Sequence, residues 1–93
     1  MTREQVLAAI QRGEEARALL ESAPFVSAMN DLSNEHLRML LAAAPGDADR
    51  QERDHAHLMI HALRQITEEL AARVRFGEDA RADLLDETRD EDF

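Results

Sequence analysis

The chain has 93 residues, which limits it to one small domain and excludes the two-lobed clefts in which many enzymes enclose a substrate. Hydrophobic residues make up 44% of the sequence, mostly as Ala and Leu, and this composition excludes disordered and collagenous chains and favours packed helices. Three Gly and two Pro are too few for an all-β sandwich, and the absence of Cys excludes disulfides, thiolate metal sites and a Cys nucleophile.

The charge is strongly acidic, with 11 basic residues, all Arg, against 20 acidic ones and a formal net charge of -9. Such a chain repels phosphate, so we expect no direct contact with nucleic acid. No apolar run is long enough to span a bilayer, and the first residues lack the apolar centre of a signal peptide. We therefore expect no membrane partner, and a protein that stays in the cytoplasm or enters a particle assembled there.

The first predicted helix begins at Thr2, because Thr2 and Gln5 have the spacing of a capping box. Apolar and small residues then recur at steps of three and four as far as about Glu21. Gly13 lies inside this stripe, where glycine costs about 1 kcal/mol relative to Ala. Its presence indicates either a break or, as we favour, a close approach by a neighbouring backbone.

The second predicted helix follows Ser22-Ala23-Pro24, because Pro is tolerated in a first helical turn. From Phe25 onward an apolar stripe continues for about five turns, and His36 lies in its middle. A His at such a position is more often a hydrogen-bonded core or interface residue than a ligand. Ser33 offers a second start signal, so one helix and two short helices both remain open.

The third predicted helix follows the turn at residues 45–49 and is the longest, from about Asp49 to Phe76. Glu69 precedes Arg73 by four residues, the favourable order for an ion pair on an exposed helix face. Gly77 then stands where helices often end, since glycine adopts the left-handed conformation of a helix C-terminus without strain.

The last sixteen residues carry eight acids and two bases, a net -6 of the total -9. We therefore divide the chain into a helical domain at 1–77 and an acidic C-terminal tail at 78–93. The simpler interpretation of the tail is a solvated segment with one frayed helical turn. The alternative is a docking segment in which Leu84, Leu85 and Phe93 are anchors.

The sequence thus predicts an all-α fold, an antiparallel helical hairpin or a three-helix bundle with one long third helix, and shows no internal repeat. Further apolar residues lie off the main stripes, which leaves more apolar surface than one hairpin can cover, so we expect an oligomer. These additional residues include Leu7, Leu19, Leu37, Leu41, Ile60 and Ala71. The predicted interface residues are Phe25, Met29, Leu32, His36, Leu40, Leu58, Leu63, Ile66, Leu70, Leu84, Leu85 and Phe93.

A metal site is the only chemistry that the spacing suggests, because Asp54, His57 and His61 share one stripe of the third helix. Arg50 and Arg64 lie in the same sector and oppose a cation. The stripe also lacks the Glu of a His-Glu-x-x-His metalloprotease helix. We therefore expect a solvated or subunit-facing polar stripe, with no metal, no cofactor and no enzymatic activity; a metal-binding oligomer would need these side chains to converge between subunits.

Residues 12–26 and 57–77 resemble small helical proteins encoded in the structural-gene regions of tailed bacteriophages and prophages, in helix punctuation and apolar spacing. The resemblance covers about residues 12–77 and leaves out both ends of the chain. The resemblance implies a non-enzymatic structural or assembly subunit that packs against itself or a larger phage protein, in the host cytoplasm or the virion. The alternative is an acidic inhibitor that mimics nucleic acid and binds a host defence protein. Against it, the acids gather in one tail, whereas a duplex mimic is expected to space them along a folded face.

Overall fold

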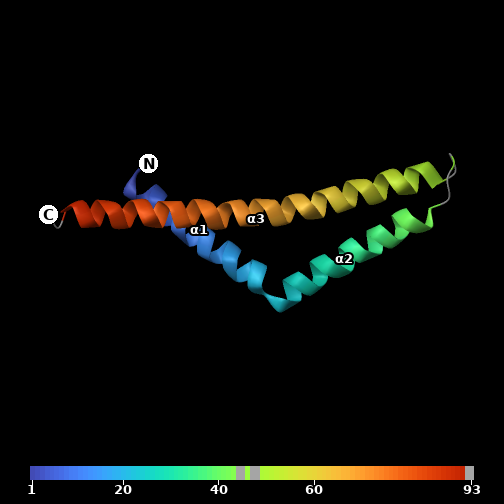
Figure 1. Ribbon diagram of the computed structural model, residues 1–93, viewed down its shortest axis with the longest axis horizontal. Helices are drawn as coiled ribbons and strands as arrows, with labels where there is room; N and C mark the ends of the chain where they lie inside the picture. The colour runs from blue at the N-terminus through green and yellow to red at the C-terminus, as the bar shows by residue number, and fades with distance from the viewer. Residues whose placement is uncertain (44–45, 47–48, 92–93) are drawn as a thin grey trace. The chain divides into compact units, whose positions relative to one another are not determined.

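The computed structural model describes residues 1–43, 46 and 49–91, with side chains as far as residue 87. Within these residues the chain forms three helices and no strand, namely α1 (Arg3–Glu21), α2 (Ala23–Ala42) and α3 (Arg50–Glu91) (Figure 1). The all-α prediction and the long third helix are confirmed. The helices form two compact units, Met1–Glu21 with Glu68–Phe93, and Ser22–Thr67.

The start of α1 is fixed by the predicted capping box. The Thr2 backbone N–H donates to Gln5 Oε1 at 2.8 Å, and the Gln5 N–H donates to Thr2 Oγ1 at 3.1 Å, so the two residues satisfy each other. The helix ends at Glu21 because Ser22 leaves helical geometry, with φ -70° and ψ 120°. Pro24 then occupies the first turn of α2, where its missing N–H costs no hydrogen bond.

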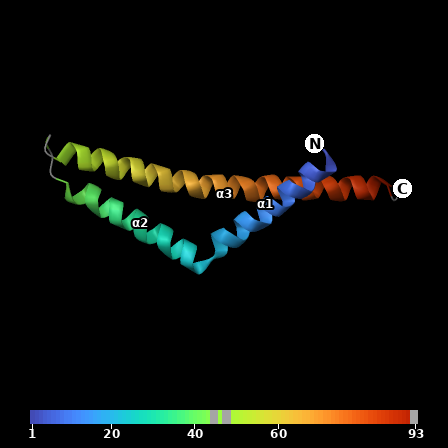
Figure 2. The same cartoon turned by 180° about the vertical axis from the view of Figure 1, so that it is seen from behind.

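The unit of residues 22–67 is an antiparallel hairpin of α2 and the first part of α3 (Figures 1 and 2). The helix α2 is continuous through Ser33, so a split at that residue is excluded. Between the helices, Gly46 has φ 141°, a conformation that favours glycine, and its carbonyl accepts a hydrogen bond from Arg53 Nη2 at 2.9 Å.

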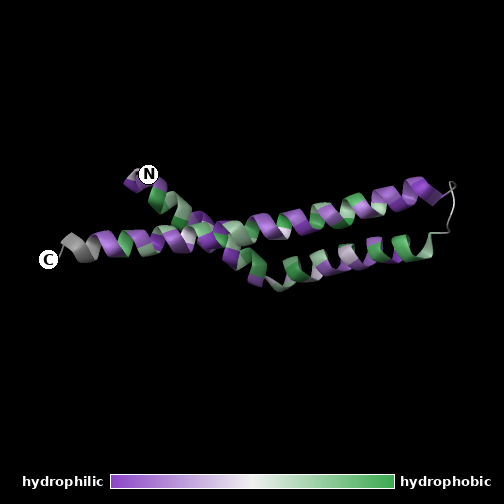
Figure 3. Ribbon diagram, turned by 45° about the horizontal axis from the view of Figure 1, so that its top comes forward, coloured by the Kyte–Doolittle hydropathy of each residue, from purple (hydrophilic) through white to green (hydrophobic). Residues whose placement is uncertain are grey.

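The interior of this hairpin is small. Its buried residues are Ala56, which is 0% exposed, Leu63 and His36. The hydropathy colouring shows green patches along α2 and a mainly hydrophilic first part of α3 (Figure 3). The hairpin therefore buries a narrow seam and leaves many of its large apolar side chains in contact with solvent.

In the other unit, α1 crosses the C-terminal part of α3 with the chains antiparallel (Figures 1 and 2). Every buried residue described at this crossing is small: Ala9, Gly13 and Ala16 from α1, and Gly77 and Ala80 from α3. Small side chains let two helix backbones approach closely, so the packing here is backbone against backbone.

The predicted end of the third helix at Gly77 is wrong, because α3 continues through this glycine to Glu91. The physical reason is tertiary: Gly77 is needed for close packing against α1 and not for a left-handed turn. Residues 78–91 thus extend the helix, and Ala80 is buried at 2% exposure, so this part of the acidic segment packs and is not a frayed turn. Phe93 lies outside the described residues.

Candidate functional site

The most distinctive feature of the structure is the contact between Gly13 of α1 and Gly77 of α3. A Cβ atom added at Gly13 would lie 2.9 Å from the Arg73 carbonyl oxygen and 3.0 Å from Gly77 Cα. A Cβ at Gly77 would lie 3.0 Å from both the Ala9 carbonyl oxygen and Gly13 Cα. Backbone atoms cannot move aside as a flexible side chain can, so a larger residue at either position would push the two helices apart. The close approach predicted for Gly13 is confirmed.

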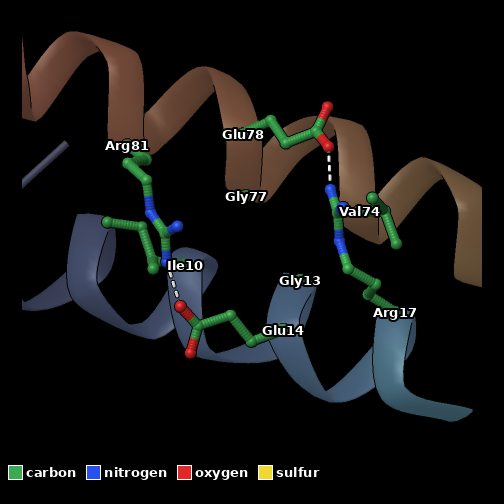
Figure 4. A pocket seen from close by; sticks show the side chains of 8 residues that line it. All are labelled: Ile10, Gly13, Glu14, Arg17, Val74, Gly77, Glu78 and Arg81. Atoms are coloured by element: carbon green, nitrogen blue, oxygen red, sulfur yellow. Dashed lines mark hydrogen bonds and ion pairs between the residues drawn. The ribbon is translucent and has the colours of Figure 1, made fainter.

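Two ion pairs flank the glycine contact (Figure 4). Arg17 of α1 pairs with Glu78 of α3, and Arg81 of α3 pairs with Glu14 of α1. All four side chains are more than half exposed, so each pair contributes little to stability but fixes which residues face one another. The crossing therefore has an apolar, backbone-packed centre between two charged edges.

These contacts are reciprocal because the two helices carry nearly the same short sequence, with five of six residues identical. Residues 13–18 are Gly-Glu-Glu-Ala-Arg-Ala, and residues 77–82 are Gly-Glu-Asp-Ala-Arg-Ala. Residues 13–18 are called the α1 strip here, and residues 77–82 the α3 strip. Glu14 and Glu78 each pair with the Arg of the other strip, each Gly meets the other Gly, and Ala16 and Ala80 are both buried. The crossing has a local pseudo-two-fold axis.

The expectation that the chain has no internal repeat is therefore wrong at this short scale. The equivalence also extends beyond the strips to half-buried apolar pairs at the same separation of 64 residues. These pairs are Val6 with Leu70, Ile10 with Val74, and Leu20 with Leu84. A comparison of the residues around each glycine would have revealed the repeat.

A shallow hollow of about 400 Å³ lies on the pseudo-two-fold axis (Figure 4). Its walls are four equivalent pairs of residues, with the glycines in the middle and one ion pair on either side of them (Figure 4). The lining is Ile10, Gly13, Glu14, Arg17, Val74, Gly77, Glu78 and Arg81. The carboxylates and guanidinium groups neutralise one another here, which leaves no net charge to select an ionic ligand.

In the hairpin unit, His36 is the one buried polar side chain of the described residues, at 8% exposure. Its ring meets the ring of His55 edge to face, with centroids 5.8 Å apart. His36 Nδ1 is buried and has no hydrogen-bond partner among the described residues. The position of His36 in the apolar stripe is as predicted, whereas its neighbour His55 was not expected.

The predicted interface residues separate into two groups. Several are buried or half-buried within the chain and contribute to its own packing: Phe25, Met29, His36, Leu40, Leu63, Leu70 and Leu84. Others are exposed: Leu32, Leu58, Ile66 and Leu85. The off-stripe residues Leu7, Leu19, Leu37 and Leu41 are exposed as well, whereas Ile60 and Ala71 are half-buried. The structure thus leaves a substantial set of large apolar side chains uncovered within one copy of the chain.

Asp54, His57 and His61, the candidate metal ligands, are all exposed on α3. Within the described part of the chain, no three His, Asp or Glu side chains are arranged so that they could hold a metal ion. Nor does any helix there have the length and apolarity to cross a membrane. Comparison of the chain with protein-family models, curated proteins and solved structures finds no match.

Proposed function

We propose that the protein is a non-enzymatic assembly subunit, whose helices bind further copies of the chain or a larger protein through apolar side chains. The observation that carries this proposal is the contrast between its interior and its surface. Among the residues whose side chains the structure describes, the buried hydrophobic ones are four alanines and Leu63, while twelve large hydrophobic side chains are exposed. Burial of a large apolar side chain is worth about 1.5–3 kcal/mol, so helix pairs with such an interior gain considerably from association.

Among the described leucines, exposure is greatest at two residues of the hairpin unit, Leu41 at 77% and Leu58 at 67%. Contact with another copy or a larger protein would cover these side chains, because exposed apolar surface promotes association. The resemblance to proteins of phage structural-gene regions supports a role as a subunit of a virus particle or of its assembly pathway. Such a subunit would act in the host cytoplasm or the virion. The acidic residues then keep the unassembled chain soluble.

The proposal is tested by the mass of the protein in solution. We expect sedimentation equilibrium at micromolar concentration to show an oligomer, and the double variant Leu41→Gln/Leu58→Gln to shift the population toward monomer. A matched control, Asn34→Gln/Gln51→Asn, exchanges exposed polar residues on the same two helices and should leave the mass unchanged. A wild-type chain that stays monomeric, and is absent from purified particles, contradicts the proposal.

A further inference from the structure

We propose that the crossing of α1 and α3 is an exchangeable joint, in which α1 of one copy crosses α3 of a second copy to form a closed dimer. The inference deepens the proposed function and rests on it for the role of the dimer, but a different observation carries it. That observation is the pseudo-two-fold crossing of two nearly identical strips.

The first step is that each of the named contacts at the joint is made by one strip with equivalent residues of the nearly identical strip on the other helix. Gly13 meets Gly77, Glu14 pairs with Arg81, and Arg17 pairs with Glu78. A strip with Glu three residues before Arg is complementary to its own antiparallel copy. The strips therefore recognise one another by charge as well as by shape.

The second step is that exchange conserves these interactions. When α1 leaves its own α3 and crosses the α3 of a partner, the same glycine contact and the same two ion pairs form again, twice per dimer. The interface gained equals the interface lost. The free-energy difference between the monomer and the exchanged dimer therefore comes mainly from the connection between helices and the loss of freedom on association.

The third step is the connection itself. Only Ser22 separates the last residue of α1 from the first of α2, and its extended φ and ψ are the point where the chain leaves helical geometry. A change of backbone conformation at this residue redirects the whole of α1 without breaking any hydrogen bond inside α2. Short connections of this kind favour segment exchange between copies.

Charge reversal tests the joint with matched variants. The α1-reversed variant carries Glu14→Arg and Arg17→Glu, and the α3-reversed variant carries Glu78→Arg and Arg81→Glu. In either variant, like charges face each other at the joint, both within the chain and in an exchanged homodimer. In a mixture of the two, an exchanged heterodimer restores all four ion pairs. The quadruple variant restores the pairs within one chain and is the control for folding.

We expect native mass spectrometry to show a 1:1 heterodimer in the mixture, about tenfold or more above either homodimer. Wild-type protein labelled with ¹⁴N and ¹⁵N should likewise form mixed dimers. The exchange is overturned if the quadruple variant folds like wild type but the mixture yields no heterodimer, or if wild-type copies do not mix. A heterodimer that is no more abundant than either homodimer also overturns it, because association then does not depend on which strips are complementary.

The two proposals fail separately. If Leu41→Gln/Leu58→Gln abolishes association of the wild-type chain and the charge-reversed mixture gives no heterodimer, the apolar association stands and the exchange falls. If the mixture gives the heterodimer and the leucine substitutions change nothing, the exchange stands and the apolar surface of the hairpin is not the assembly interface.

Discussion

At the scale of single residues, the two glycines of the joint are fixed by backbone contacts. Gly13→Ala is expected to destabilise the protein, although Ala is the better helix former by about 1 kcal/mol. The added Cβ would press on the Arg73 carbonyl oxygen and on Gly77 Cα, which forces the helices apart. We expect the free energy of unfolding to fall by about 1–3 kcal/mol, measured by urea denaturation followed by circular dichroism.

The control for this prediction is Ala18→Leu, an addition of volume on the exposed side of α1. It should change the free energy of unfolding by less than about 0.5 kcal/mol. If Gly13→Ala instead stabilises the protein by its helix propensity alone, α1 and α3 are not in backbone contact in solution.

His36 is the second position at which the surroundings predict how a substitution changes stability. Its Nδ1 atom is buried without a partner among the described residues, and an unsatisfied buried polar atom costs about 1–3 kcal/mol. His36→Leu removes this atom and keeps an apolar side chain in the seam, at the loss of the edge contact with His55. We expect thermal unfolding to show a stabilised protein, with a gain of about 1 kcal/mol.

His55→Leu is the matched control for His36→Leu, because it alters the exposed partner of the same ring pair. Its effect should stay within about 0.5 kcal/mol. A destabilised His36→Leu protein would show that the His36 ring makes a stabilising polar interaction in solution, and that this residue is selected for something other than packing.

At the scale of helices, local sequence was sufficient wherever local interactions decide the structure. The capping box at Thr2 and Gln5, the break at Ser22 and the Glu69–Arg73 pair, at 3.3 Å, all involve residues within a few positions of one another. The end of the third helix was mispredicted because glycine has two uses. Its conformational freedom suggests a helix end, whereas here the lack of a side chain permits contact with a helix 64 residues away in the sequence.

Only part of the candidate site could be predicted from the sequence, for a related reason. The surplus of apolar side chains follows from composition and periodicity, which is why Leu41 and Leu58 could be expected at the surface or an interface. To predict the joint, one must see that residues 13–18 and 77–82 match and also know that these two segments meet. Periodicity assigns residues to a helix face but does not determine which helix covers that face.

Pro24 opposes exchange, because it keeps α1 and α2 from joining into one helix. In a continuous helix through residues 20–28, its ring would clash with the carbonyl of the preceding turn and its missing N–H would leave that carbonyl unpaired. Pro24→Ala removes this obstacle, so α1 and α2 can join into one helix that carries α1 toward another copy. We expect the fraction of mixed-label dimer to rise in native mass spectrometry, whereas Ala23→Ser should leave it unchanged. A lower dimer fraction for Pro24→Ala contradicts the exchange route.

At the scale of the whole molecule, two opposing forces act on association. Exposed apolar side chains draw copies together, while a net charge of -9 on each copy repels them. Salt screens the repulsion and leaves the apolar attraction intact. The ion pairs of the joint do not alter this salt dependence, because the monomer and the exchanged dimer contain the same pairs in equal number per chain.

Self-association should therefore tighten as salt rises from about 0.05 M to about 0.5 M, a range over which the screening length falls severalfold. Sedimentation equilibrium at each concentration measures the effect. Asp83→Asn/Asp86→Asn/Glu87→Gln removes three exposed charges of α3, so this variant should associate more tightly at low salt and respond less to added salt. Self-association that weakens steeply with salt would contradict apolar assembly. Binding to a basic protein that weakens in the same way would favour the acidic inhibitor, since screening removes the attraction between opposite charges.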